Sequence, residues 1–148
     1  MKAVLQRVRS AAVAVDGRKV SGIDRGILVL LGVAAGDGRE QVEWLAGKVS
    51  RLRIFADEEG KMSRSVEAAG GEILVVSQFT LLADCRKGNR PSFGPAAPPG
   101  EGERLYRWFV EEVRRLSSVP VREGVFGAMM DVSLVNDGPV TFVLDTPS

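Results

Sequence analysis

The sequence predicts a single α/β domain over residues 1–148, with a mixed, largely antiparallel and curved sheet and two main helices packed on it. Two observations lead to this prediction. Most periodic segments are short and either apolar or alternating, which is the pattern of strands. Two longer segments, 39–52 and 101–116, repeat apolar residues at intervals of three and four, which is the pattern of amphipathic helices. The 148 residues, 45% of them hydrophobic, suffice to bury one core.

The first strands are predicted from alternation and from one turn signal. Residues 2–8 alternate, residues 12–15 form an apolar run, and Asp16-Gly17 predicts a hairpin turn into a strand over 19–23. The continuous apolar run of 27–33 predicts a central strand, because a strand buried on both faces has no polar side.

Each helix has one apolar stripe, which predicts the face that it buries. The stripes are Val42, Leu45, Val49 and Leu52 in the first helix, and Leu105, Phe109, Val113 and Leu116 in the second. The remaining segments predict strands over 53–56, 72–79, 119–122, 129–135 and 140–144, with turns at 57–60 and 136–139.

The strand expected over 72–79 changes character near its end. After an apolar run, three hydrogen-bonding side chains, Ser77, Gln78 and Thr80, follow within four residues. A buried strand that becomes polar at its carboxyl end is a common way to build a site. The same pattern also fits a strand that simply emerges into solvent, and the spacing alone leaves both interpretations open.

The segment 83–102 has no periodicity and is long for a loop in a compact domain. It contains the cations Arg86, Lys87 and Arg90 together with four prolines. Cations, an aromatic side chain and free backbone suit a phosphate-rich ligand. An ordinary solvated loop is the alternative interpretation.

The composition excludes several classes of enzyme. No histidine is present, so the chain holds no Ser-His-Asp site, no Cys-His site and no metal site that needs histidine. The single cysteine, Cys85, allows no disulfide within the chain and has no histidine to activate it as a nucleophile. Any catalysis must therefore use carboxylates, hydroxyls, backbone dipoles or groups of the substrate.

The expected location is cytoplasmic. One cysteine fits a reducing compartment. No segment reaches the roughly 18 apolar residues that span a bilayer, and polar residues interrupt the N-terminus too early for a secretory signal. The net charge of +1 does not by itself require a polyanionic partner.

Two motifs resemble the signature motifs of the bacterial D-aminoacyl-tRNA deacylases: Ser77-Gln78-Phe79-Thr80-Leu81 and Asn136-Asp137-Gly138-Pro139-Val140-Thr141. Further stretches agree with that family over essentially the full length, with comparable spacing. They are Gln6-Arg7-Val8, Arg53-Ile54-Phe55, Gly60-Lys61-Met62 and Arg90-Pro91-Ser92-Phe93. Either motif alone is a weak signal, whereas both in order with these flanks are specific.

The resemblance implies a homodimer that hydrolyses the ester between a D-amino acid and the terminal ribose of tRNA, without a metal or cofactor. Ser77, Gln78, Phe79 and Thr80 would line a pocket at the dimer interface. Gly138-Pro139 of the other subunit, joined by a cis bond, would reach in and exclude L side chains. Glycine would fit, so glycyl-tRNA mischarged on tRNA(Ala) is also an expected substrate. From the residues alone, Gly138-Pro139 predicts a trans β-turn.

An aminoacyl ester is already activated, so hydrolysis needs a positioned water and donors for the developing oxyanion. Backbone N–H groups near Phe79 and Thr80 can serve as donors. Ser77 or Thr80 as a nucleophile would need a base, and Asp84 is the nearest carboxylate in sequence. We expect Thr80 to orient the substrate, and the resemblance implies that the ribose 2′-hydroxyl assists the water.

Three points stay open on the sequence. Arg7 either supports the Gly-Pro segment or is an arginine of an edge strand or interface. The chain could be a module that binds the end of tRNA without chemistry. It could also be a hydrolase of other, small D-acyl esters.

Overall fold

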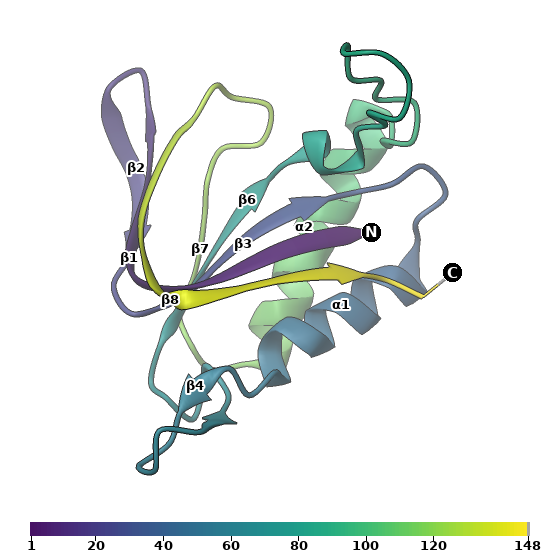
Figure 1. Cartoon of the computed structure of the whole chain (residues 1–148). Coiled ribbons are helices and arrows are strands. Elements are labelled where there is room, and N and C mark those ends of the chain that lie inside the picture. The colour runs from purple at the N-terminus through teal and green to yellow at the C-terminus, as the bar shows by residue number, and fades with distance from the viewer. Residues whose placement is uncertain (148) are drawn as a thin grey trace.

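A curved six-stranded sheet organises the chain, with both helices on one of its faces (Figure 1). The computed structural model describes residues 1–147. Its strands are β1 (Lys2–Val15), β2 (Arg18–Ile23), β3 (Gly26–Gly32), β4 (Phe55–Ala56), β5 (Met62–Arg64), β6 (Glu72–Ser77), β7 (Val121–Glu123) and β8 (Asp131–Asp145). Its helices are α1 (Arg39–Arg51), α2 (Pro99–Leu116) and a 3-10 helix over Phe79–Leu82.

β1 pairs with neighbouring strands along most of its length on both edges. On one edge its first half pairs with β3 and its second half with β2, while β8 pairs with both halves on the other edge, all antiparallel. β6 continues the sheet parallel to β3, and β7 continues it parallel to β6. The Ser21 hydroxyl of β2 donates to the backbone oxygen of Glu123 in β7, so the sheet curls towards a barrel. The predicted mixed, curved sheet with two helices is thus confirmed.

The two strands expected over 2–8 and 12–15 are one strand, because Arg9 and Ser10 continue it. Both side chains are exposed, which breaks the apolar pattern without breaking the backbone pairing. Here β8 shifts register against β1. An interrupted pattern therefore marks a bend of the sheet and not the end of a strand. The predicted Asp16-Gly17 hairpin is confirmed, with φ values of 51° and 77°.

The predicted turn at 136–139 is wrong, because β8 runs through it. Gln6 lies opposite Thr141 and Val8 lies opposite Asn136, so residues 137–140 of β8 face Arg7 alone. The turn residues therefore form a wide bulge within one strand. The reason is that the segments on both sides of them pair with the same neighbour, β1, and a reversal of the chain would remove one of these pairings.

Other boundaries differ by small amounts. The strand expected over 72–79 ends at Ser77 and passes into the 3-10 helix. The second helix begins at Pro99, where proline lacks only an amide that the first turn leaves unbonded. β5 was not predicted. It pairs with the two-residue β4 in a separate small hairpin, closed by hydrogen bonds from Ser63 and two backbone amides to Asp57.

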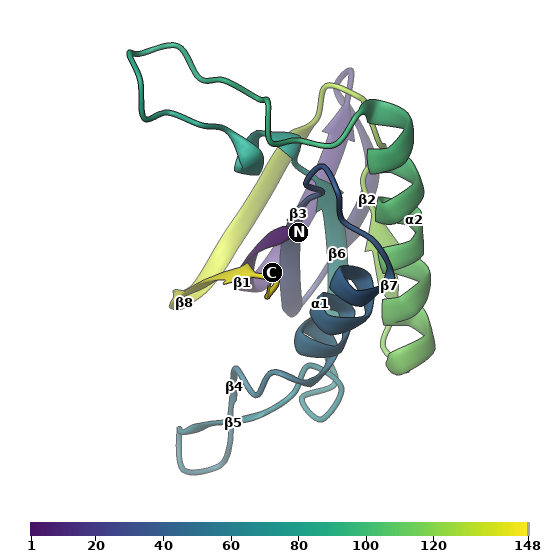
Figure 2. The same cartoon turned by 90° about the vertical axis from the view of Figure 1, so that its right-hand side faces the viewer.

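Both predicted helix stripes are confirmed as core. Val42, Leu45 and Val49 of α1, with Leu105, Phe109 and Val113 of α2, pack on one face of the sheet. Figure 2 shows the two helices side by side on that face. A second, smaller cluster lies on the other face, inside the curl. β6 contributes to both clusters, as its continuous apolar run predicts.

Tyr106 of α2 fixes β6 just before the strand ends. Its hydroxyl donates to the backbone oxygen of Val75 at 3.2 Å, and its ring packs against Phe126. Burial, with a further effect of Glu123, raises the pKa of the Tyr106 phenol well above its ordinary value. The folded chain therefore keeps this donor protonated.

We expect Tyr106→Phe to lower the free energy of unfolding by about 1 kcal/mol, because the ring is kept and one buried hydrogen bond is lost. Since the pKa is raised on folding, this difference should be full below pH 10.0, the ordinary tyrosine pKa, and should shrink above it. Urea unfolding across pH 7 to 11 measures it. Tyr106 is the single tyrosine, so tyrosinate absorbance reports it directly. Titration of the folded chain at the ordinary pKa would contradict this account.

Candidate active site

The segment Ser77–Thr80 leaves β6 and turns over the end of β3. The backbone N–H of Gln78 donates to the backbone oxygen of Leu31 at 2.7 Å, which holds the turn against the sheet. Gly32 permits this approach, because a Cβ there would lie 2.4 Å from a Leu82 methyl carbon. The Gln78 side-chain amide donates to the Thr80 hydroxyl, whose own proton stays available to a ligand.

Two backbone amides of this turn are available as donors. Within the described residues 1–147, the N–H groups of Phe79 and Thr80 donate to no protein oxygen. Both residues are exposed, so both amides can reach a ligand. A pair of free amides beside a hydroxyl is the arrangement that stabilises an oxyanion.

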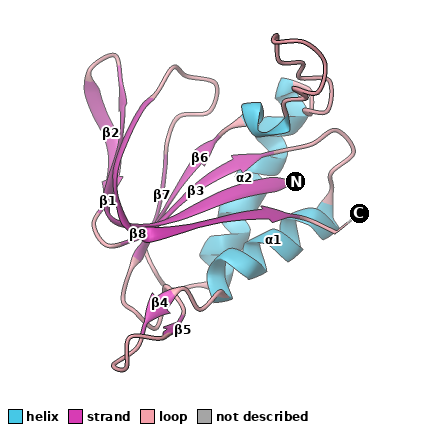
Figure 3. Cartoon of the chain, viewed as in Figure 1, coloured by secondary structure: helices cyan, strands magenta, loops and turns pink. Residues whose placement is uncertain are grey.

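Phe79 forms an apolar wall next to these donors. Its side chain is 57% exposed, and Phe93 packs against it edge to face with the ring centroids 5.1 Å apart. Phe93 belongs to the long segment after the 3-10 helix, which has little regular structure (Figure 3). Phe79 was predicted as a site residue from its motif. The contribution of Phe93 was not predicted, although Arg90-Pro91-Ser92-Phe93 also resembles the family.

Asp84, the carboxylate closest in sequence, is not placed to act as a base for Thr80. Both of its oxygens accept from the Arg86 guanidinium, at 2.9 and 2.7 Å. These hydrogen bonds hold the pKa of Asp84 below its usual range. In the part of the chain that the structure describes, no carboxylate hydrogen-bonds to Ser77 or Thr80. A hydroxyl nucleophile would thus lack the base that it needs.

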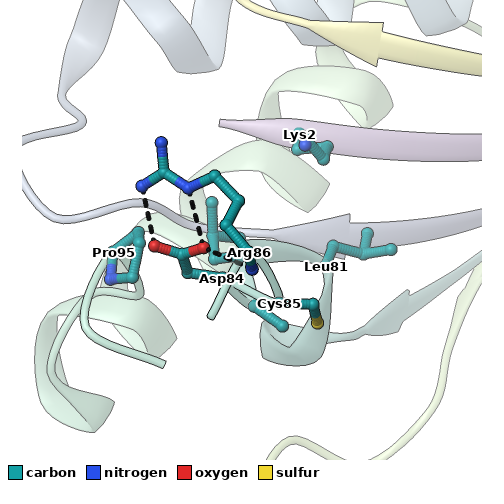
Figure 4. Close-up of a pocket in the computed structure, with 8 residues that line it drawn as sticks. Lys2, Leu81, Asp84, Cys85, Arg86 and Pro95 are labelled. Carbon is teal, nitrogen blue, oxygen red and sulfur yellow. Dashed lines mark hydrogen bonds and ion pairs between the residues drawn. The ribbon is translucent and has the colours of Figure 1, made fainter. Parts of the chain in front are cut away.

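A cavity of about 310 Å³ adjoins the turn (Figure 4). Figure 4 shows the Asp84–Arg86 pair among the residues that line the cavity, with Cys85 and Leu81 to the right of Asp84 in this view. Its lining residues are Lys2, Leu81, Leu82, Ala83, Asp84, Cys85, Arg86 and Pro95. Cys85 is an exposed free thiol.

The second motif forms the bulge of β8 and presents its backbone outwards. The Gly138–Pro139 peptide bond is cis, and both residues are exposed. A Cβ on residue 138 would lie 2.1 Å from the Val140 nitrogen and 2.6 Å from Asn136 Oδ1, so only glycine fits. The residues alone predicted a trans β-turn, and the structure corrects this to a bulge with a cis bond. The bulge forms because β8 pairs with β1 on both sides of it.

Arg7 holds this bulge. Its Nε donates to the Asp137 backbone oxygen at 3.0 Å, and its Nη1 donates to the Ile54 backbone oxygen at 2.7 Å. The Asp137 carboxylate lies 3.3 Å from the same Nε. Of the two interpretations of Arg7, the structure supports the one in which it braces the Gly-Pro segment.

Asn136 links the start of the bulge to its end and to β1. Its side-chain amide donates to the backbone oxygens of Arg7, at 2.9 Å, and Val140, at 3.1 Å. This role was not predicted. The signal was present, since asparagine ahead of Asp-Gly often hydrogen-bonds to nearby backbone.

The two motifs do not meet within one chain. Ser77 and Ala3 both pair with Leu31, whereas Gly138 lies beside Arg7. From Ala3 to Arg7 the strand covers about 13 Å, and the three strand spacings from β6 to β8 add about 14 Å across the sheet. Measured along the sheet, the two motifs therefore lie at separate places in one copy of the chain.

A family model described as D-Tyr-tRNA(Tyr) deacylase matches residues 4–145. A D-aminoacyl-tRNA deacylase of Opitutus terrae is 60% identical, with 99% of this chain and 97% of that protein covered. One of Geobacter sulfurreducens is 58% identical, with 100% and 97% covered.

Two solved structures have the same fold. A c-Myc DNA unwinding element binding protein is 45% identical, with a TM-score of 0.95 and 100% of both chains covered. A probable eukaryotic D-amino acid tRNA deacylase has a TM-score of 0.83 at 20% identity, with 98% of both chains covered, and this likeness concerns the fold alone.

Together these findings define a hydrolase. The chain belongs to the D-Tyr-tRNA(Tyr) deacylase family. The prediction of a D-aminoacyl-tRNA deacylase is thereby confirmed at the level of family and enzyme class. Within the described residues, no helix is long and apolar enough to cross a membrane.

We expect Arg7→Lys to lower the free energy of unfolding by about 1 to 3 kcal/mol, because one ammonium cannot reach two carbonyls on separate segments. Urea unfolding measures the loss. Arg9→Lys is the matched control: Arg9 contacts the same Asp137 carboxylate at 3.2 Å but is 70% exposed, so its exchange should leave stability close to wild type. Equal losses of unfolding free energy in both variants would show that the two hydrogen bonds of the Arg7 guanidinium have no special role.

Proposed function

We propose that the chain acts as a homodimer that hydrolyses the ester of D-aminoacyl-tRNA and rejects the L ester. The observation that carries this proposal is the Ser77–Thr80 turn. It offers two free amides and a hydroxyl but no base, in a chain whose family consists of deacylases. Such a site suits a substrate that is already activated and that brings a hydroxyl of its own.

In the proposed reaction, a water oxygen attacks the ester carbonyl carbon. The amides of Phe79 and Thr80 stabilise the negative charge that develops on the carbonyl oxygen. The bond from the carbonyl carbon to the ribose oxygen then breaks, and that oxygen takes up a proton. The neighbouring ribose 2′-hydroxyl assists by relaying the proton of the water, because Asp84 is occupied by Arg86. The products are the free amino acid and tRNA.

A second subunit completes the site in this proposal. Gly138 and Pro139 are exposed, braced by Arg7 and distant from the Ser77–Thr80 turn of their own chain. Large apolar side chains are exposed on the same strand, with Val135 at 52% and Val143 at 64%. A partner surface would cover them.

Selection by chirality follows from backbone rigidity. A fixed peptide of the second subunit occupies the space where an L side chain would lie, whereas a D substrate places only hydrogen there. Glycine passes the same filter, so glycyl-tRNA mischarged on tRNA(Ala) is a second proposed substrate. We place this reaction in the cytoplasm, where aminoacyl-tRNA is used and where the exposed thiol of Cys85 stays reduced.

The experiment that tests the proposal is deacylation of D-tyrosyl-tRNA and L-tyrosyl-tRNA by the purified protein with EDTA present. We expect fast loss of the D ester while the L ester stays at its spontaneous rate. Loss of both esters would remove the chiral role of Gly138-Pro139. Loss of neither would leave a module that binds the end of tRNA. Equal rates on a free D-tyrosine ester would indicate a small-molecule hydrolase.

We expect Thr80→Ala to lower kcat/KM for D-tyrosyl-tRNA by roughly tenfold to a hundredfold, the range for one lost hydrogen bond to the substrate. Ser77→Ala, a change of the same kind at the half-buried end of β6, is the matched control and should have less effect. Single-turnover deacylation, with thermal unfolding to confirm the fold, measures both. A loss on the order of ten thousandfold at Thr80 would instead indicate a nucleophile.

A further inference from the structure

We propose that residues 84–92, which we name the basic arm, bind the phosphates of the tRNA acceptor end. The inference rests on the proposed function and assigns a surface that the reaction itself does not use. Figure 2 shows the arm extending away from the sheet and helices, beyond the 3-10 helix. A loop that makes so few contacts with its own chain is free to contact a ligand.

The arm is built as a hairpin. Its two ends are joined by hydrogen bonds between Asp84 and Ser92, with nitrogen–oxygen distances of 2.7 and 3.0 Å. Gly88 lies at the tip with a φ of 63°, a conformation that glycine adopts without strain. Three residues separate Asp84 from the tip, and the chain bends over residues 86–90. Figure 2 shows that the arm extends beyond the 3-10 helix.

The charge of the arm is strongly positive. It contains three cations, Arg86, Lys87 and Arg90, and one acid, Asp84, whose carboxylate is bound to Arg86. Among residues 1–147, no acidic side chain lies within ion-pair distance of Lys87 or Arg90, and both are exposed. On α2, by contrast, Arg107 pairs with Glu103. The whole chain has a net charge of only +1, so this local excess is a property of the arm.

The arm begins at the border of the candidate active site. Phe93 follows it directly and packs against Phe79, whose amide is one of the two proposed oxyanion donors. An aminoacyl group held at Thr80 therefore brings the preceding nucleotides of its tRNA to the root of the arm. Each of these nucleotides carries one phosphate, which Lys87 and Arg90 can neutralise.

The composition of the arm favours RNA over a protein partner. Between Asp84 and Ser92 no large apolar or aromatic side chain is present to anchor a protein interface. Cations, Asn89 and the exposed backbone suit phosphate oxygens. Such contacts fix the position of the tRNA without reading its sequence.

The test compares the wild type with the double variant Lys87→Gln/Arg90→Gln. The control is Lys61→Gln/Arg64→Gln, which removes the same charges from the β4–β5 hairpin at the opposite end of the molecule (Figure 1). The readouts are the Kd for uncharged tRNA, its dependence on salt, and kcat/KM for D-tyrosyl-tRNA and for 3′-O-D-tyrosyl-adenosine, which has no phosphate. Sedimentation measures the oligomeric state.

We expect the arm variant to raise the Kd for tRNA roughly tenfold and to reduce the slope of log Kd against log salt by about one to two. Its kcat/KM should fall on D-tyrosyl-tRNA and stay unchanged on the adenosine ester, and the control should match the wild type. Unchanged tRNA affinity would overturn the proposal, as would an equal loss on both substrates or a change in oligomeric state. If the wild type cleaves neither ester, the proposed function fails, while the Kd values still decide the role of the arm.

Discussion

The backbone pairing of β1 is the constraint on which the rest of the structure depends. Because β1 is paired along both edges, it fixes β3 on one side and both halves of β8 on the other. β6, and with it the Ser77–Thr80 turn, takes its position from β3. The bulge of Gly138 and Pro139 takes its position from Arg7 on β1. Both motifs are thus aligned by one strand, although they lie at separate places along the sheet.

The polar contacts of the candidate site come mainly from the main chain. The free amides of Phe79 and Thr80 and the exposed peptide of Gly138 and Pro139 are all backbone groups. Side chains such as Arg7, Asn136 and Tyr106 hold these groups in place. The absence of histidine from the sequence is consistent with such a site, since the proposed reaction leaves the chemistry to the ester, the water and the ribose.

The sequence predicted correctly the features that depend on interactions between residues close together in the chain. The stripes of α1 and α2, the Asp16-Gly17 hairpin and the apolar run of β6 depend on periodicity and turn chemistry, and all are confirmed. The bulge at 137–140 was misread because its residues have turn chemistry, while the long-range pairing of β8 with β1 decides the outcome. β5 was missed because it is only three residues long and its residues, Met62, Ser63 and Arg64, carry no apolar pattern.

For the candidate site, the sequence named residues but not the contacts that hold them. The polar end of β6 indicated Ser77, Gln78 and Thr80 from the residues alone, whereas Gly138 and Pro139 were assigned a role only through resemblance. The bracing of the bulge by Asn136 and the packing of Phe93 on Phe79 required the three-dimensional arrangement. Contacts between segments more than a hundred residues apart, such as that of Arg7 with Asp137, leave no periodic trace in a sequence.

The bulge in β8 also has a mechanical consequence. Residues 137–140 have no backbone partner of their own in β1, but the strand is paired on both sides of them, and hydrogen bonds of Arg7 and Asn136 hold the bulge between these pairings. If this backbone is the filter that we propose, it would discriminate by resisting displacement and not by affinity for the accepted substrate. Its accuracy would then depend on the rigidity of β1 and β8, and it would decline as that part of the sheet softens, before the chain unfolds.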